Sequence, residues 1–302
     1  MLARLMLLWC VAAPNGAVAS THETVAFNVD EIAPGVFVHR GRHAGLEDPD
    51  RGDSANIGFV IGETCVAVID SGGSIAIGAR LLAAIRARTV RPVCYVINTH
   101  GHFDHVLGNA AFSVEKPHFV GHSKLGAAID GSREYFAEHF AVELGNPPRV
   151  VGPDIVVENE LTLDLGEREL KLKAHPIAHS DSDLTVFDVR TQTLWSGDLL
   201  FIERLPVLDG KLTGWLAWME TAAMDKVVRV IPGHGPVSAQ WPKSLDAQRE
   251  YLLSLIATVK KALAAGEFLE NVTAKANAPP GWQLSAAHTR NLSRAYREFE
   301  WQ

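Results

Sequence analysis

The chain has 302 residues, of which 47% are hydrophobic and 21% charged, as in an ordinary globular protein with a sizeable core. Its 28 basic and 35 acidic residues give a formal net charge of -7, which argues against nucleic acid or an anionic membrane surface as the natural partner. The charge by itself names no partner; the small-molecule substrate that we expect follows from the motifs further along the chain.

The first 19 residues have the pattern of a secretory signal peptide. Arg4 supplies a positive charge, Leu5 to Ala13 form a short apolar run, and Ala17-Val18-Ala19 offers small residues for cleavage. The run is too short to cross a bilayer, and no later segment reaches the ~18 apolar residues that a span requires. We therefore expect residues 20–302 to be periplasmic or secreted, with no membrane span after cleavage; an uncleaved anchor is the alternative.

Cleavage would leave two cysteines, Cys65 and Cys94, each within an apolar run typical of a strand. In an oxidising compartment they could form a disulfide if the two strands are neighbours, and otherwise they would be two separate buried thiols. The sequence leaves both arrangements open.

Two hairpins and a helix are predicted before the central motif. Apolar residues around a Pro34-Gly35 turn predict a hairpin over residues 25–39, and a second one is expected over residues 57–69. Ser74 stands where a helix N-cap is expected. A short apolar run from Val93 to Ile97 then predicts a buried strand.

That strand leads into a cluster of metal-binding side chains, Thr99-His100-Gly101-His102-Phe103-Asp104-His105. Residues two apart on an extended segment point the same way, so His100 and His102 can hold one ion, whereas the adjacent Asp104 and His105 diverge and can reach a second. Four donors in six residues favour a metal site over unrelated surface or core side chains. The spacing therefore predicts room for two ions.

The second half of the chain repeats the order of strands followed by helices. Residues 123–145 are predicted to be helical, either as a lid over the site or as a plain surface helix pair. A second set of five strands is expected between residues 155 and 196, followed by helices over residues 212–224, 244–264 and 285–299. This order suggests two β-sheets packed face to face with helices outside.

Three further metal-binding residues follow at predicted strand ends or in glycine-containing turns: His179, Asp198 and His234. Side chains at such positions can reach a cleft. With these residues after the HxHxDH motif, the sequence resembles the metallo-β-lactamase superfamily from Asp70 through His234.

The resemblance implies an α/β (α+β) fold, an αββα four-layer sandwich formed as a single domain by residues 20–302. It also implies two zinc ions, the first held by His100, His102 and His179, the second by Asp104, His105 and His234, with Asp198 bridging them. Nitrogen-rich ligation favours zinc over magnesium or calcium, while iron and manganese stay open.

Within the superfamily, three connecting segments are similar to the exported quinoprotein relay system zinc metallohydrolases: residues 51–56, 179–187 and 194–215. That family is associated with pyrroloquinoline-quinone (PQQ)-dependent alcohol oxidation. The similarity implies a functional link to a PQQ-dependent dehydrogenase, and it does not identify a substrate.

The expected chemistry is hydrolysis. Bound zinc lowers the pKa of a coordinated water to roughly 7, so a metal-bridging hydroxide could attack the carbonyl of a thioester, ester or lactam. Asp104 is the candidate catalytic residue that orients this hydroxide and moves its proton. Because zinc β-lactamases commonly carry Cys or Ser where this chain has Asp198, β-lactamase activity is not assumed; an Asp here resembles the glyoxalase II-type thioesterases.

Residues around the ligands are also candidates. Asp70 is expected to orient ligands, and Glu203, Arg204 and Asp209 follow Asp198 where ligand support or a pocket rim is expected. His122 either lines the cleft or has a structural role.

Two other functions stay open. One is a mononuclear iron enzyme of the persulfide dioxygenase kind, which shares the HxHxDH framework. The other is a non-catalytic periplasmic partner of a quinoprotein dehydrogenase.

Overall fold

The computed structural model describes residues 27–146 and 149–301. The predicted signal segment, residues 1–19, lies outside this part of the chain. Among the described residues, no helix combines the length and the hydrophobicity that crossing a membrane requires.

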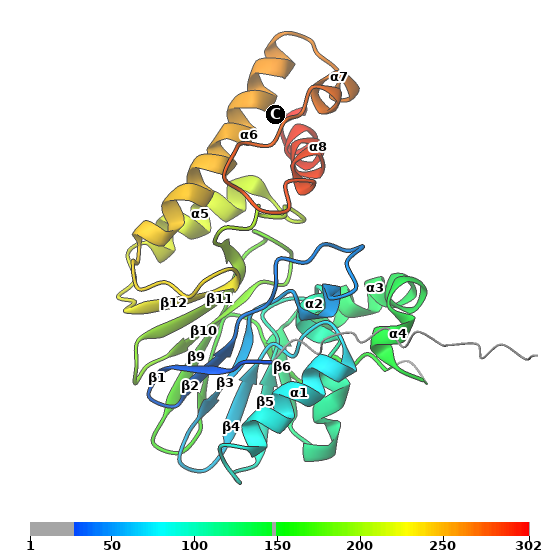
Figure 1. Ribbon diagram of the computed structural model, residues 1–302. Coiled ribbons are helices and arrows are strands. Elements are labelled where there is room, and N and C mark those ends of the chain that lie inside the picture. Colours follow the sequence, from blue (N-terminus) through cyan, green and yellow to red (C-terminus); the bar gives the residue numbers. More distant parts are fainter. Residues whose placement is uncertain (1–26, 147–148, 302) are drawn as a thin grey trace, which may run out of the picture.

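Two β-sheets packed face to face form the centre of the molecule (Figure 1). The seven-stranded sheet contains, in spatial order, β1 (Asp30–Ala33), β2 (Val36–His39), β3 (Ile57–Ile61), β4 (Val66–Ile69), β5 (Val93–Ile97), β6 (His118–His122) and β7 (Ile155–Val157). The five-stranded sheet contains, in spatial order, β12 (Arg229–His234), β11 (Thr193–Phe201), β10 (Leu184–Asp188), β9 (Glu169–Ala174) and β8 (Glu160–Asp164).

One strand lies in a different sheet from the one we expected. The sequence places β7 at the start of the second set of strands, but it pairs in parallel with β6 and completes the first sheet. Its Val157 is buried in the core between the sheets. The second sheet therefore begins at β8.

Helices cover the outer faces of the sandwich, which confirms the αββα fold class (Figure 1). Beside the seven-stranded sheet lie α1 (Ile75–Arg86), α2 (Phe103–Val106), α3 (Leu125–His139) and α4 (Ala141–Leu144). On the other side lies α5 (Leu212–Ala222), and α6 (Asp246–Ala264), α7 (Leu269–Ala274) and α8 (Ala287–Phe299) extend beyond the sheets. Short 3-10 helices occur at η1 (Arg51–Asp53), η2 (Asn109–Glu115) and η3 (Lys243–Leu245).

The side chains of strand β4 pack into two hydrophobic clusters, one on each face of the first sheet. Its Ala67 and Ile69 pack between the sheets, whereas Val66 and Val68 pack toward α1, so all four side chains are buried. The helix α1 starts as predicted, because Ser74 Oγ accepts a hydrogen bond from the Ile77 backbone nitrogen at 3.1 Å.

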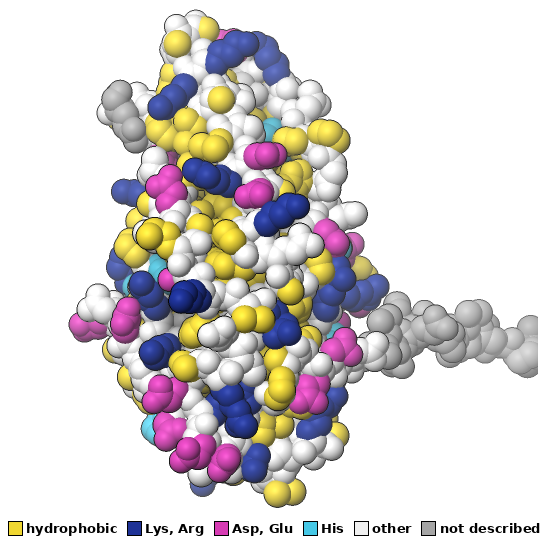
Figure 2. All heavy atoms as spheres, turned by 90° about the vertical axis from the view of Figure 1, so that its left-hand side faces the viewer, with side chains coloured by type: hydrophobic (Ala, Val, Ile, Leu, Met, Phe, Trp, Pro, Cys, Tyr) yellow, Lys and Arg dark blue, Asp and Glu magenta, His cyan; other side chains and the backbone are white. Residues whose placement is uncertain are grey.

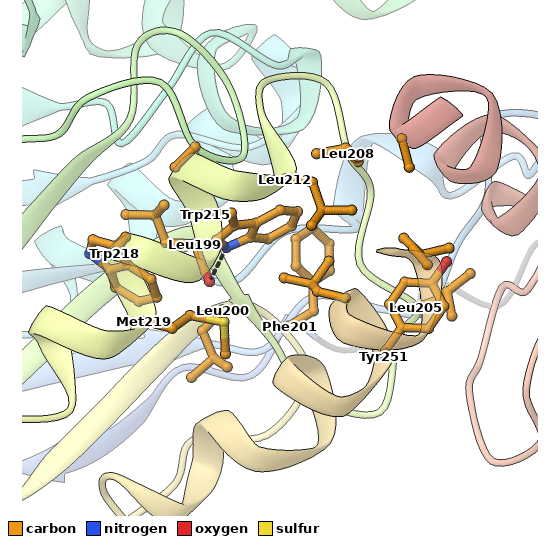
Figure 3. Packing of buried hydrophobic residues seen from close by; sticks show 14 of the residues in the cluster. Leu199, Leu200, Phe201, Leu205, Leu208, Leu212, Trp215, Trp218, Met219 and Tyr251 are labelled. Carbon is orange, nitrogen blue, oxygen red and sulfur yellow. Dashed lines mark hydrogen bonds between the residues drawn. The ribbon is translucent and has the colours of Figure 1, made fainter. Parts of the chain in front are cut away.

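The outer face of the five-stranded sheet packs on α5. Leu194 of β11 and Val230 of β12 share one buried cluster with Trp215 and Met219 of α5. Trp215 Nε1 donates a hydrogen bond to the Leu199 carbonyl oxygen at 2.8 Å, so the indole is anchored within this core (Figure 3).

The fourth layer covers only part of this sheet. In β9, Leu170 and Leu172 are buried while Lys171 and Lys173 are exposed, and the outer face of β8 carries Thr162 beside them. Figure 2 shows charged side chains of both signs scattered over the lower half of this side of the molecule. The period-two pattern of β9 is that of a strand with one solvated face.

Candidate metal centre

The metal-binding motif lies where parallel strands β4 and β5 end side by side. Asp70 follows β4, and His100 follows β5 by three residues. His102 is still extended, with φ -73° and ψ 152°, and α2 starts at the next residue. The chain therefore changes from extended to helical within the motif, which separates the first two histidines from Asp104 and His105 as the spacing predicts.

The first group of donors comprises His100, His102, His179 and Asp198. His102 Nδ1 lies 3.0 Å from His100 Nε2 and 3.1 Å from His179 Nε2. Asp198 Oδ2 lies 3.6 Å from His100 Nε2 and 3.5 Å from His179 Nε2. Four donors around a tetrahedral zinc at ordinary bond lengths stand about 3.3 Å apart, so these separations fit one such ion.

The second group comprises Asp104, His105 and His234, whose donor atoms all lie within 4.8 Å of one another. Asp104 Oδ2 is 3.5 Å from His234 Nε2, and Asp104 Oδ1 is 3.9 Å from His105 Nε2. This group is looser than the first, yet it presents the same types of donor.

Asp198 stands between the two groups. Its Oδ2 faces the first group, whereas its Oδ1 lies 3.2 Å from both His105 Nε2 and His234 Nε2. Asp198 Oδ1 and His105 Nε2 are buried and have no hydrogen-bond partner among the described residues. Unpaired buried polar atoms are costly, and a cation bound between the groups would satisfy both atoms. The residues present therefore fit metal ions.

The second ring nitrogen of each histidine in the two groups is also held; for His100 this nitrogen is Nδ1, which lies 3.1 Å from Thr99 Oγ1. Asp70 Oδ2 lies 2.8 Å from His105 Nδ1, and Asp70 accepts two more hydrogen bonds from Thr99. His179 Nδ1 donates to the Val207 carbonyl oxygen at 2.7 Å. Such contacts fix the tautomer and the ring orientation of a metal ligand. The structure thus places Asp70 in the orienting position that we expected.

Asp209 has the same relation to His102. Its Oδ2 lies 2.8 Å from His102 Nε2, so Nδ1 of that ring is left to face the first group. For His234, Nδ1 lies 2.8 Å from the Ser54 carbonyl oxygen. Ser54 also donates from Oγ to Asp104 Oδ2 at 2.7 Å. One serine therefore orients two members of the second group.

The electrostatic environment suits metal binding. Burial lowers the pKa of His179 to about 4 and holds the pKa of His100 well below its usual value, so both rings are neutral at pH 7. For Asp198, burial opposes ionisation, but the facing histidines outweigh it and hold its pKa well below the usual range. Metals require neutral imidazoles and an ionised carboxylate, so these two rings and Asp198 are already in the ligand form. His105 differs: burial opposes its charge, but Asp198, Asp70 and Asp104 outweigh burial and hold its pKa well above the usual value, so a bound metal would displace a proton there.

A cavity of about 330 Å³ opens over both groups. Asp198 and His234, both buried, line it together with Phe103 of α2 and Tyr135 and Phe136 of α3. The helix that we considered as a lid therefore forms a wall of the cavity.

Of the other residues that we predicted near the metal-binding groups, some line the cavity and some do not. Arg204 lines the cavity, with Nη1 2.8 Å from His234 Nδ1. Glu203 instead points away from the metal-binding groups: its φ is +67°, its side chain is half exposed, and it pairs with Arg40 at 2.8 Å. His122 is not among the residues that line this cavity, and its Nε2 lies 3.2 Å from the His175 carbonyl oxygen.

Four residues that contribute to the site were not singled out from the sequence. Ser54 lies in a segment that carried the family resemblance, so a signal existed. Val207 contacts His179 through its backbone oxygen, a contact that cannot be predicted from the type of the residue. Arg290 and Arg294 line the cavity from α8, which is remote in sequence from every motif.

Comparisons with known proteins agree with this geometry. A sequence model of the metallo-beta-lactamase superfamily matches residues 50–234. No curated protein matches the chain.

Among solved structures, the stereoselective inverting sec-alkylsulfatase Pisa1 from Pseudomonas sp. is 16% identical, with a TM-score of 0.68 over 90% of this chain and 50% of its own. The chain thus spans about half the length of that enzyme. A metallo-beta-lactamase from Pontibacter korlensis is 20% identical, with a TM-score of 0.59 over 75% of this chain and 98% of its own.

A metallo-beta-lactamase from Hirschia baltica is 17% identical, with a TM-score of 0.59 over 74% of this chain and 96% of its own. These likenesses show a shared fold. Together with the match over more than half of the sequence, they lead to one conclusion: the chain belongs to the metallo-beta-lactamase superfamily.

Proposed function

We propose that this protein is a hydrolase that binds two zinc ions and cleaves a thioester, ester or lactam. The observation that carries the proposal is the position of Asp198, whose two carboxylate oxygens each face a different group of histidines. A carboxylate in this position can bridge two ions.

In this proposal, His100, His102 and His179 hold one zinc, and Asp104, His105 and His234 hold the other. Zinc bound there would polarise a carbonyl and lower the pKa of a coordinated water to roughly 7. Asp104 lines the cavity with Oδ2 fixed by Ser54, so its carboxylate is placed to orient a water and accept its proton. Arg204 lies at the cavity beside His234 and can stabilise negative charge that develops on the substrate.

The test combines metal analysis with a substrate screen. Natively purified protein is analysed by mass spectrometry for bound metals and assayed with thioesters, lactones, β-lactams and an alkyl sulfate ester. We expect two zinc ions per chain and hydrolysis of at least one carbonyl substrate. His102→Ala and Asp198→Ala should lose bound metal and turnover, whereas Asp130→Ala, an exposed change on α3, should lose neither.

Other outcomes would favour other functions. Full activity in a metal-free Asp198→Ala variant would reject the proposal. One iron per chain with oxygen consumption on a persulfide would instead favour the dioxygenase alternative. No turnover of any substrate, together with tight binding to a quinoprotein dehydrogenase, would favour a non-catalytic partner.

We also propose export to the periplasm and a functional link to a PQQ-dependent dehydrogenase. The first rests on the signal pattern of residues 1–19, and the second on the similarity of three connecting segments. Fractionation of cells that express the full chain tests export: a mature protein that begins near Ser20 in the periplasm supports it, and an unprocessed cytoplasmic protein contradicts it.

A further inference from the structure

The C-terminal helix α8 brings two arginines to the metal cavity. Arg290 and Arg294 are one turn apart on α8, and both line the cavity that Asp198 and His234 also line. Their side chains are 48% and 49% exposed, so water or a ligand can reach the guanidinium groups. The helix α8 is far in sequence from the ligands, yet it forms part of their cavity.

Arg290 and Arg294 share one carboxylate, that of Asp209. Arg290 Nη2 lies 3.3 Å from Asp209 Oδ2, and Arg294 Nη2 lies 3.5 Å from Asp209 Oδ1. The same carboxylate holds His102 Nε2 at 2.8 Å. One carboxylate thus faces two guanidinium groups and an imidazole. Arg204 adds a third guanidinium to the cavity wall, which also carries the carboxylates of Asp104 and Asp198, two of the proposed metal ligands.

The contacts to Asp209 leave much of each guanidinium available. Each arginine reaches Asp209 through one nitrogen only, at a separation at or near the upper limit for a hydrogen bond. A guanidinium carries five N–H donors in a planar arrangement that matches carboxylates and other oxyanions. If the only role of the pair were to hold Asp209, shorter and better shielded contacts would be expected.

We propose that Arg290 and Arg294 bind an anionic group of the substrate, a carboxylate or another oxyanion. The inference rests on the proposed hydrolase function, because it assigns the substrate class of the same cavity. The aromatic wall formed by Phe103, Tyr135 and Phe136 would contact the apolar body of the substrate. The scissile group would then lie over Asp198, between the arginines and that wall.

The kinetic test compares two substrates that differ in one charge. S-phenyl thiobutyrate is neutral, and the S-phenyl monothioester of glutaric acid carries a terminal carboxylate; a sulfonate-terminated homologue distinguishes carboxylates from other oxyanions. We expect the wild type to prefer the charged substrates in kcat/KM. In Arg290→Ala/Arg294→Ala this preference should fall about tenfold or more, which is the usual consequence of losing charge-assisted hydrogen bonds.

Two further variants separate recognition from structure. Arg297→Ala removes an exposed arginine of the same helix that is not among the residues lining the cavity, and it should keep the wild-type preference. Arg290→Lys/Arg294→Lys should restore part of the preference because it restores the charge. If the double alanine variant loses the same factor in kcat/KM on the neutral and the charged substrates, the arginines only hold Asp209 and the proposal is wrong.

A binding measurement keeps this inference apart from the proposed function. Titration calorimetry with glutarate, methanesulfonate and neutral butyramide does not require turnover. Binding of the anions that is lost in Arg290→Ala/Arg294→Ala supports the anion site even if no thioester is hydrolysed. If thioesters are hydrolysed, but neither anion binds and the charged substrate has no advantage, the anion site is refuted and the hydrolase stands.

Discussion

Each histidine of the two metal-binding groups has a contact at both ring nitrogens. One ring nitrogen faces the metal-binding groups, and the other is fixed by a carboxylate, a hydroxyl or a backbone oxygen. For His105 the second partner is Asp70, which itself has a φ of +53° and is held by Thr99 at 2.8 Å through both the backbone nitrogen and Oγ1. The affinity for metal should therefore depend on residues that never touch it.

Asp70→Asn tests this dependence. The amide can no longer offer the same charged acceptor to His105 Nδ1, so metal affinity at the second group should fall by roughly 10- to 100-fold. Competition with a chromophoric chelator measures the affinity of each ion in turn. The first ion should bind nearly as in the wild type, and Asp130→Asn is the matched surface control. Equal affinities in Asp70→Asn and the wild type would contradict the orienting role.

Cys65 provides a second prediction for a single residue. Cys65 directly precedes β4, and Cys94 lies in β5, the neighbouring strand. Both are free thiols in the structure. Burial, together with the adjacent Cys94, raises the pKa of Cys65 to about 12. A thiol whose pKa is raised stays protonated below that pH, so at pH 8 almost none of the folded protein carries the reactive thiolate at Cys65.

After reduction, Cys65 should therefore resist iodoacetamide at pH 8 in the folded protein and react in denaturant. Peptide mapping by mass spectrometry gives the extent of labelling at each cysteine. Fast labelling of folded Cys65 at pH 8 would show that the thiol is neither buried nor protonated. The same mapping without reductant detects any disulfide between Cys65 and Cys94.

The helix α8 connects the C-terminal helices to the metal-binding groups. Asn291 is fully buried; its Oδ1 accepts from the Leu208 backbone nitrogen at 2.9 Å, and its Nδ2 donates to the Pro206 carbonyl oxygen at 2.6 Å. The loop held in this way carries Val207 and Asp209, which orient His179 and His102. The position of α8 therefore affects the orientation of His179 and His102 through this loop.

Asn291→Ala should weaken this connection. It leaves two buried backbone groups without their partner, which costs roughly 1–3 kcal/mol for each unsatisfied group. We expect a lower free energy of unfolding in urea and weaker binding of the first metal ion. Ser293→Ala, on the same helix but bonded only to the Thr289 carbonyl oxygen, should change neither quantity. A destabilised Asn291→Ala variant with unchanged metal affinity would limit Asn291 to a packing role.

Arg168 joins the two sheets at the end of the sandwich that lies away from the metal-binding groups. Its Nη1 donates to the carbonyl oxygens of Pro34, in the turn between β1 and β2, and of Ile61 in β3, both at 3.0 Å. Its Nη2 and Nε donate to Asp188 of the second sheet at 2.7 and 3.0 Å. Both charged side chains are almost completely buried. This clamp joins the two sheets at the strand ends away from the metal-binding groups.

Arg168→Ala should destabilise the whole molecule. Removing one partner leaves Asp188 buried without its counter-charge, which typically costs about 3–5 kcal/mol. Urea unfolding should show this loss, while the metal content of the remaining folded protein should match the wild type. Arg190→Ala, an exposed change near the same strand ends, should cost less than about 0.5 kcal/mol. A loss as small as that of the control would show that the clamp contributes little.

Much of this molecule could be predicted from local patterns. The Ser74 cap, the two hairpins and the strand before His100 follow from periodicity and turn residues, because these signals act over a few positions. The HxHxDH spacing likewise places its four donors through backbone geometry alone. These features need no knowledge of what lies across the core.

Only the tertiary structure decided which distant segments meet. The strand β7 joins the first sheet, Asp209 turns to His102, Glu203 turns away to Arg40, and α8 delivers Arg290 and Arg294 to the cavity. None of these contacts has a local signal, since each depends on how two sheets and their covering helices pack. Side chains far apart along the chain become neighbours only when that packing fixes both of their positions.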